Sequence, residues 1–228
     1  MTTGTRFATS RDGTRIAYNV LGEGPKLVIV NGAMGFRGMS FAKQAAAAFA
    51  RYCTVIEYDR RGRGESGDAP SYSVSREVED LDALIRAVGE PCAVFAQSSG
   101  AALALKAAAA GVPIKALVAY EPPYMVAGAT PAQAEYGARV TALIAEGKRD
   151  AAVKLFMVTV GVPGFFILLM RLMPFWKDAR TVAHTLPYDA AIMDGFALPT
   201  AELRSIRIPV VAAAGEKTPP VQIGRAHV

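Results

Sequence analysis

The stretch CAVFAQSSGAALA, from Cys92 to Ala104, consists of an apolar run typical of a strand, a turn of small residues and an alanine-rich helical run. Ala96 and Gly100 lie two positions either side of Ser98, which gives the small-x-Ser-x-small pattern of a nucleophile elbow. A strand-to-helix turn this tight admits only small residues at those two positions, and it points Ser98 outward beneath the positive end of the following helix. The pattern therefore predicts that Ser98 is a nucleophile.

Strand-like and helical runs alternate on both sides of this stretch. The apolar runs that predict strands span residues 26–30, 54–58, 92–96 and 114–119. The amphipathic or alanine-rich runs that predict helices span residues 40–50, 74–88 and 99–110. Strands buried on both faces are continuously apolar, and their alternation with helices predicts an α/β domain with a mostly parallel sheet. A strand–turn–strand with Asp12-Gly13 at its turn opens the chain.

Residues 122 to about 199 show helical patterns only, and strand character returns at residues 209–214. Thr130-Pro131 is a good helix start, and an apolar helix is expected over residues 165–173. We therefore expect a helical insertion between two strands of one sheet. The expected divisions are a core over residues 1–121, the insertion over 122–200, the continuation of the core over 201–222 and a tail over 223–228.

The composition fits one globular domain. The 228 residues are 52% hydrophobic and 20% charged, which allows a substantial core and excludes a disordered or collagen-like chain. The two cysteines, Cys53 and Cys92, form no CxxC motif, so a reducing cytoplasm is the expected location. No signal peptide is visible at the start. The longest apolar run, residues 164–173, is shorter than the ~20 residues of a membrane-spanning helix, so no membrane partner is expected.

The formal net charge is +5, from 25 Lys and Arg against 20 Asp and Glu. The dense basic group is Arg60, Arg61 and Arg63, and no aromatic residues interleave with it as a nucleic-acid platform would require. We therefore expect a solvated basic surface and no nucleic-acid partner. Residues 62–67 match GxGxxG, but Pro70 follows where a dinucleotide site needs a helix, so we expect no cofactor.

Three motifs give the chain a family resemblance. Residues 58–66 read YDRRGRGES after one expected strand, Ser98 lies in the elbow, and Glu121 begins a Glu-Pro-Pro sequence at the end of another strand. With these motifs in this order, the chain resembles the single-domain α/β-hydrolases over residues 5 to about 220. The resemblance implies a mostly parallel sheet flanked by helices, a helical lid, and hydrolysis of an ester or similar acyl bond through an acyl-serine intermediate.

The resemblance also implies roles for individual residues. Ser98 would attack the acyl carbonyl, while the backbone N–H groups of Ser99 and Ala33 would form the oxyanion hole. Asn31 stands where many members have histidine, but the backbone does the chemistry there. The insertion would be the lid that selects the substrate, a small apolar acyl or alkyl group. The residues expected to bind that group are Phe165, Phe166, Trp176 and Met34.

The catalytic acid has two candidates. The family position, in the loop after residues 209–214, holds Thr218, which cannot orient a histidine as a carboxylate does. Glu121 is the favoured substitute, because some members of the fold draw their acid from the preceding strand. Glu216, in the same loop as Thr218, is the alternative.

The general base has no clear position in the sequence. His184 lies inside the insertion, where we expect a lid or core histidine, and His227 lies in the last six residues. In the family the base follows one further strand, and that unit takes ~30 residues, whereas 13 follow Gly215. We therefore expect a chain that stops before its catalytic histidine and is inactive by itself. Residues 223–228, IGRAHV, match one reading frame of a common sequencing adapter, so we expect a non-native tail.

Two rival functions stay open from the residues alone. A non-catalytic ligand-binding module would keep the pocket without turnover, and a cofactor-free perhydrolase would use the same residues as an esterase. Labelling of Ser98 by a fluorophosphonate would separate the first rival from an enzyme.

Overall fold

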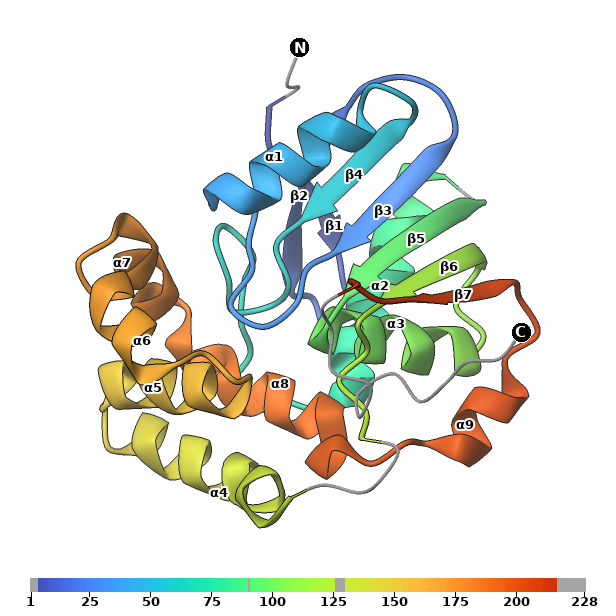
Figure 1. The fold of residues 1–228 in the computed structure, drawn as a ribbon. Coiled ribbons are helices and arrows are strands. Elements are labelled where there is room, and N and C mark those ends of the chain that lie inside the picture. Colours follow the sequence, from blue (N-terminus) through green and yellow to red (C-terminus); the bar gives the residue numbers. More distant parts are fainter. Residues whose placement is uncertain (1–3, 90, 126–129, 217–228) are drawn as a thin grey trace.

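A seven-stranded sheet forms the centre of the molecule, in the order β1-β2-β4-β3-β5-β6-β7 (Figure 1). The structure, a computed structural model, describes residues 4–89, 91–125 and 130–216. The strands are β1 (Arg6–Thr9), β2 (Arg15–Leu21), β3 (Lys26–Val30), β4 (Thr54–Tyr58), β5 (Cys92–Gln97), β6 (Ile114–Tyr120) and β7 (Val210–Ala213). β2 pairs antiparallel with β1 and β4, and the other neighbouring pairs of this described sheet are parallel. The mostly parallel sheet expected from the sequence is confirmed.

Helices cover both faces of the sheet. α1 (Ser40–Phe49) lies on one face, while α2 (Val74–Val88) and α3 (Ser99–Ala109) lie on the other (Figure 1). In β3, Ile29 packs in the cluster on the α1 side, whereas its neighbour Val28 packs in the cluster formed with α2 and α3. Because successive side chains of a strand point to opposite faces and both faces are buried, the strand is apolar at every position from 27 to 30.

The alanine-rich helix α3 lies close against the sheet. Its residues from Ser99 to Leu105 are all buried. Small side chains let a helix approach its neighbours closely at the packing density of a protein interior. The run of alanines therefore allows α3 to pack close to the sheet.

The hairpin at the start of the chain is confirmed. β1 pairs with β2 in a register that places Thr9 opposite Arg15. Thr14 N–H donates to Asp12 Oδ1 at 2.9 Å, so the aspartate side chain stabilises the turn that its sequence predicts.

A bundle of helices lies between β6 and β7 in the chain and beyond the carboxyl ends of the parallel strands in space (Figure 1). We call residues 131–196 the lid. Its helices are α4 (Pro131–Ala145), α5 (Arg149–Thr159), α6 (Gly164–Met170), α7 (Pro174–Thr181), η1 (Ala183–Thr185), α8 (Leu186–Met193) and η2 (Asp194–Phe196). The lid has its own apolar core, in which Tyr136, Val153 and Leu186 are almost completely buried. α9 (Thr200–Ser205) then leads into β7.

Capping residues and proline set the limits of the lid helices. α4 begins as expected just after Thr130, whose side chain accepts from Gln133 N–H while the Gln133 side chain accepts from Thr130 N–H. The apolar helix expected over residues 165–173 is present as α6, which ends at Met170, and a separate helix, α7, begins at Pro174. Proline has no N–H to continue the preceding helix, but it fits the first turn of a new one.

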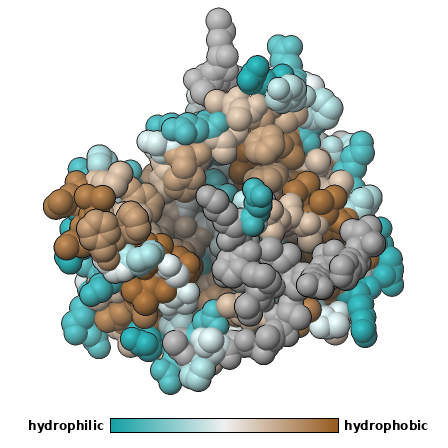
Figure 2. All heavy atoms as spheres, in the orientation of Figure 1, coloured by the Kyte–Doolittle hydropathy of each residue, from teal (hydrophilic) through white to brown (hydrophobic). Residues whose placement is uncertain are grey.

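The lid carries an exposed apolar surface around α6. Figure 2 shows hydrophobic residues gathered where α6 and α7 lie in Figure 1. We call this surface the lid patch; its side chains, each more than half exposed, are Phe165, Phe166, Leu168, Leu169, Leu172 and Met173. Among the helices that the structure describes, none has the length and apolar content needed to cross a membrane.

Candidate active site

Ser98 occupies the sharp turn between β5 and α3. Its backbone angles, φ +52° and ψ −128°, are strained for a residue that carries a side chain. Ser98 N–H donates to Tyr120 O at 2.9 Å, which ties the turn to the end of the neighbouring strand β6. The neighbouring strand therefore holds the serine in the conformation that the elbow pattern predicts.

The small residues of the elbow are required by close backbone contacts. A Cβ on Gly100 would lie 2.5 Å from Val30 O and 2.6 Å from Asn31 O, so α3 crosses the end of β3 with no room for a side chain. A Cβ on Gly32 would lie 3.0 Å from the Ser98 Cβ. The segment after β3 is thereby packed directly against the serine.

Two backbone segments flank Ser98. The first N–H groups of α3, including that of Ser99, have no acceptor within the helix and lie at the positive end of its dipole. On the other side, Gly35 N–H donates to Gly32 O at 3.1 Å and closes a turn that contains Ala33. We call residues 32–35 the oxyanion turn. Both segments thus adjoin Ser98: Ser99 follows it directly in the chain, and the backbone of Gly32, which precedes Ala33, packs against the Ser98 Cβ.

A cavity of about 150 Å³ adjoins Ser98. Its walls come from the elbow, the segment after β6 and the lid elements α4, α5, α8 and η2. Ser98 and Glu121 contribute polar groups to it. The larger apolar side chains that line it are Met125, Tyr136, Phe156, Val160, Met193 and Phe196.

Glu121, the favoured candidate acid, lies at this cavity with Ser98. Its φ of +48° turns the chain sharply at the end of β6, and its N–H donates to Ala213 O at 2.8 Å. Gly215 N–H donates to Glu121 Oε1 at 3.2 Å, so the loop after β7 helps to orient the carboxylate. The alternative acid, Glu216, is exposed in that loop.

His184 lies in η1 of the lid and faces Asp68, with 3.7 Å between His184 Nε2 and Asp68 Oδ2. Burial lowers the pKa of the His184 imidazole, and the nearby Arg149 adds to this effect. The described residues that line the cavity beside Ser98 do not include His184. Thr218, His227 and the expected tail fall outside the described residues.

The four residues expected to bind substrate lie elsewhere. Phe165 and Phe166 are 72% and 52% exposed on the lid patch. Trp176 is buried in the lid core, where its Nε1–H donates to Asp150 Oδ1 at 2.7 Å, and Met34 is buried in the same cluster. None of the four is among the described residues that line the cavity. The cavity-facing aromatic residues, which sequence reasoning missed, are Tyr136, Phe156 and Phe196.

The expectation of a solvated basic surface is wrong for its densest part. Arg60, Arg61 and Arg63 are at most 1% exposed. Burying a guanidinium is strongly unfavourable without a partner, and here carboxylates from two helices supply one. Those carboxylates are Glu77 and Asp80 of α2 and Asp189 of α8. Burial lowers the pKa of Arg60, but Glu77 and Asp189 raise it well above its ordinary value, so Arg60 stays charged.

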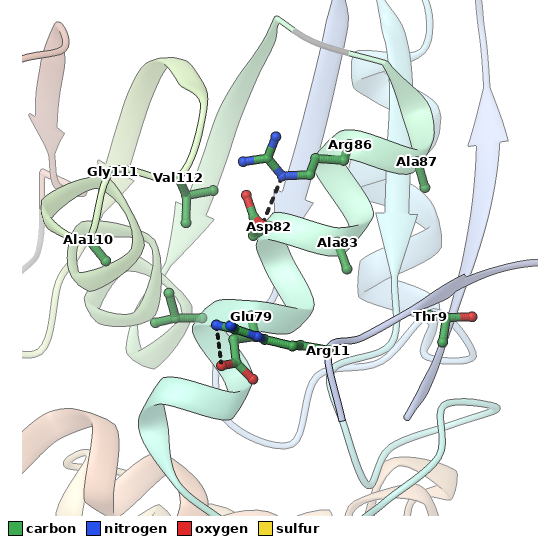
Figure 3. Close-up of a pocket in the computed structure, with 11 residues that line it drawn as sticks. Thr9, Arg11, Glu79, Asp82, Ala83, Arg86, Ala87, Ala110, Gly111 and Val112 are labelled. Atoms are coloured by element: carbon green, nitrogen blue, oxygen red, sulfur yellow. Dashed lines mark hydrogen bonds and ion pairs between the residues drawn. The ribbon is translucent and has the colours of Figure 1, made fainter. Parts of the chain in front are cut away.

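A larger cavity, of about 760 Å³, lies between α2, the end of α3 and β1 (Figure 3). Its charged side chains pair with one another, since Arg86 Nε lies 2.9 Å from Asp82 Oδ2 and Arg11 Nη1 lies 3.9 Å from Glu79 Oε1. These charged side chains therefore have partners within the cavity wall, whereas the strained serine turn lies at the smaller cavity. Within the described ranges, no group of three or more His, Cys, Asp or Glu side chains is arranged to hold a metal ion.

The fold, the serine elbow and the lid define a class of protein. The chain belongs to the alpha/beta hydrolase family, whose model matches residues 27–228. The resemblance inferred from the three sequence motifs is thereby confirmed at the level of the family.

Similar proteins carry the name hydrolase. The crystal structure of an alpha/beta hydrolase from Sphaerobacter thermophilus DSM 20745 is 45% identical with a TM-score of 0.87, over 95% of this chain and 84% of that one. A hydrolase from Pseudomonas aeruginosa PA01 is 25% identical with a TM-score of 0.68, over 93% and 80% of the two chains. The hydrolase YraK of Bacillus subtilis strain 168 is 34% identical over 97 residues, which are 41% of this chain and 35% of that protein. This last match therefore spans about a third of the relative's length.

Proposed function

We propose that the chain forms the active site of a serine hydrolase that cleaves a small ester or a similar acyl bond. Ser98 Oγ attacks the carbonyl carbon, and the N–H groups of Ser99 and Ala33 stabilise the resulting oxyanion. A base takes the Ser98 proton during the attack and gives it to the leaving oxygen, so that collapse of the intermediate expels the neutral alcohol and leaves acyl-Ser98. Water then hydrolyses acyl-Ser98 to the acid and free serine. The observation that carries the proposal is the strained Ser98 turn at the wall of a cavity, in a member of the alpha/beta hydrolase family.

The cavity supports a short apolar acyl or alkyl group as the substrate part it takes. Its volume of about 150 Å³ equals that of roughly five molecules of liquid water. Methionine and aromatic side chains form much of its wall, and these favour apolar groups. A two- to four-carbon acyl chain matches this space, and a long acyl chain exceeds it.

Glu121 is the acid that the geometry favours. It shares the cavity with Ser98 and is oriented by Gly215 N–H, whereas Glu216 is exposed. A carboxylate that is oriented in this way can hold a histidine in the tautomer that accepts the serine proton.

The proposed reaction also requires a general base that takes the proton from Ser98. We propose that His184 is not this base, because it faces Asp68 and is absent from the described lining of the cavity. Substitution of the two histidines of the chain, His184 and His227, tests both directly.

Fluorophosphonate labelling tests the nucleophile. The purified chain is treated with a fluorophosphonate, the labelled peptide is identified by mass spectrometry, and p-nitrophenyl acetate, butyrate and octanoate are assayed in parallel. We expect slow formation of the adduct on Ser98, because the described site contains no base, and loss of the adduct in Ser98→Ala. The low turnover that the oxyanion donors alone support should favour the short esters over octanoate by about tenfold in kcat/KM.

The variants of the other residues complete the test. His184→Ala and His227→Ala should keep the rate of the unsubstituted chain, whereas Glu121→Gln should lower any Ser98-dependent turnover. Labelling that persists in Ser98→Ala would overturn the proposed nucleophile. Turnover that disappears in His227→Ala would instead make His227 the base.

One observation favours a second candidate function. The described residues that line the cavity beside Ser98 include no histidine. This candidate is a non-catalytic module that binds the same short apolar group. It predicts that calorimetry detects binding of a ketone analogue of the butyrate ester while Ser98 forms no adduct and no p-nitrophenol is released.

A further inference from the structure

Asp189 of the lid helix α8 is shared by two arginines of the loop after β4. The Arg60 Nη1 donates to Asp189 Oδ1 at 2.8 Å, and the Arg63 Nη2 donates to Asp189 Oδ2 at 2.7 Å. All three side chains are completely or almost completely buried. The Arg63 Nε also donates to Thr185 Oγ1 at 3.1 Å, so a second lid residue joins the contact.

The same carboxylate reaches both backbone segments that flank Ser98. Ser99 Oγ donates to Asp189 Oδ1 at 2.7 Å, which attaches the first residue of α3. Arg63 Nη1 donates to Gly32 O at 2.7 Å and to Gly35 O at 3.3 Å, which attaches both ends of the oxyanion turn. One acidic residue of the lid is therefore connected, directly or through Arg63, to the two segments that bear the oxyanion N–H groups.

Asp189 remains an anion in this setting. Burial raises the pKa of its carboxyl, but Arg63 and Arg60 reverse this effect and hold the pKa below its ordinary value. Without the carboxylate, Arg60 would keep Glu77 as its partner, while Arg63 would be left with backbone and hydroxyl oxygens. A buried charge that loses its counterion pulls its neighbours out of place or draws in water.

We propose that Asp189 is a positioning residue for the oxyanion hole, and that it makes the correct placement of the oxyanion turn and of Ser99 depend on the docked lid. This inference rests on the proposed function for its catalytic consequence. A donor must lie within a few tenths of an ångström of hydrogen-bond distance from the developing oxyanion. A shift of the turn at residues 32–35 therefore lowers turnover with little change in the binding of the ground-state ester.

The chain offers a matched control in the same loop. Asp80 is as buried as Asp189 and binds Arg61 through two hydrogen bonds, of 2.7 Å to Nε and 2.6 Å to Nη2. Arg61 also pairs with Asp12 beside the first hairpin and donates to Arg76 O, so its hydrogen bonds within the described residues lie away from the elbow and the oxyanion turn. Asp80→Asn therefore breaks an equally buried ion pair without touching the proposed network.

The experiment compares Asp189→Asn and Asp80→Asn at a temperature at which both variants are folded by circular dichroism. For p-nitrophenyl butyrate, we expect Asp189→Asn to lower kcat by about a hundredfold with KM nearly unchanged, and Asp80→Asn to leave both constants nearly unchanged. Hydrogen exchange read by mass spectrometry should show faster exchange of the peptide over residues 30–37 in Asp189→Asn only. If Asp189→Asn does not fold, Ser99→Ala is used, with an expected loss in kcat of about three- to tenfold.

Each result decides the inference. Equal losses of kcat in the two variants, or a change in KM alone, would show a general structural role and overturn it. If the unsubstituted chain shows no Ser98-dependent turnover, the proposed function fails, and hydrogen exchange still decides the positioning role. Unchanged exchange over residues 30–37 in Asp189→Asn, or in Ser99→Ala where that variant is needed, would refute it.

Discussion

Backbone strain is concentrated around Ser98. The described non-glycine residues with positive φ number five, and four of them, Met34, Ser98, Glu121 and Phe196, lie in the oxyanion turn or at the cavity. Such conformations cost free energy and persist only where the surrounding structure imposes them. Met34, Ser98 and Glu121 lie in the sharp turns after β3, β5 and β6, whereas Phe196 lies in η2 of the lid. The elbow could be predicted from its sequence, but strain at Met34 and Phe196 could not, because no residue pattern there requires it.

The strain at Ser98 predicts a difference between two variants that both remove the hydroxyl. Glycine adopts φ +52° and ψ −128° without a Cβ penalty, whereas alanine keeps the penalty. We expect the free energy of unfolding of Ser98→Gly to exceed that of Ser98→Ala by about 1 kcal/mol, after the greater chain entropy of glycine is subtracted. Urea unfolding of the two variants measures the difference, and a lower value for Ser98→Gly would contradict the role of strain.

Glu57 of β4 is a buried carboxyl whose charged form is disfavoured. Its side chain is 3% exposed, and Oε1 has no hydrogen-bond partner among the described residues. Burial raises the pKa of Glu57 to about 7, and Asp59 adds to this effect, while Arg37 and Lys43 oppose it. Since the folded protein holds the proton to a higher pH than the unfolded chain does, stability falls as the pH rises from about 4.5 through 7.

We expect Glu57→Gln to remove this pH dependence. The variant should be more stable than the unsubstituted protein at pH 8, by roughly 3 kcal/mol, since each pKa unit corresponds to about 1.4 kcal/mol. The difference should vanish near pH 4.5, where glutamate is protonated in the folded state. Urea unfolding at the two pH values checks this, and an equal gain at both would show that the charge is not the cause.

At the scale of elements, local sequence patterns were sufficient to predict helices and strands. Contacts between residues far apart in the chain could not be predicted from these patterns. The strand at 54–58 and the helix at 74–88 match β4 and α2, because periodicity and helix caps are written in neighbouring residues. The burial of Arg60 and Arg63 was missed because their shared partner, Asp189, lies 129 and 126 residues away. A loop of three arginines followed by the acidic helix α2 is a signal that could have suggested pairing.

The lid helix that lines the cavity beside Ser98 also depended on tertiary structure. Both α5 and α6 contain phenylalanine and aliphatic residues, and the sequence alone favoured the aromatic pair of α6. The lid instead packs so that Phe156 of α5 reaches the cavity and Phe165 of α6 meets solvent. The way the whole bundle docks on the sheet decides which helix faces the cavity. Periodicity within one helix shows which of its faces is apolar, but not what that face contacts.

Two alanine variants separate these alternatives. Phe156→Ala should raise KM for p-nitrophenyl butyrate, or the dissociation constant of its ketone analogue, by about tenfold, because it removes apolar contact with the acyl group. Phe165→Ala should leave both values unchanged. The reverse result would return the substrate site to α6.

For the whole molecule, the lid patch is the feature that affects behaviour in solution. Contiguous exposed apolar surface promotes association, whereas a single exposed aromatic side chain does not. Leu172 is 85% exposed within the patch, and Tyr52, on the core, is 75% exposed. Both positions therefore accept lysine without loss of buried contacts.

We expect Leu172→Lys to raise the concentration at which the protein begins to associate, and Tyr52→Lys to raise it much less. The two variants add the same charge, so net charge alone cannot explain a difference between them. Static light scattering across a concentration series gives the onset. Equal shifts would mean that charge, rather than the patch, controls association.

Arg60 and Arg63 share the carboxylate of Asp189 in the lid, and this limits the engineering of chimaeras in which the lid of one hydrolase replaces that of another. A recombinant that joins this core to a foreign lid would inherit two buried guanidinium groups, and it would need an acid from the incoming helix in the place of Asp189. The lid and the arginine loop would thus have to be exchanged together. A library that diversifies residues 131–196 would keep Thr185 and Asp189 fixed and could vary the exposed positions of α6, while Ile167 of that helix stays apolar in the lid core.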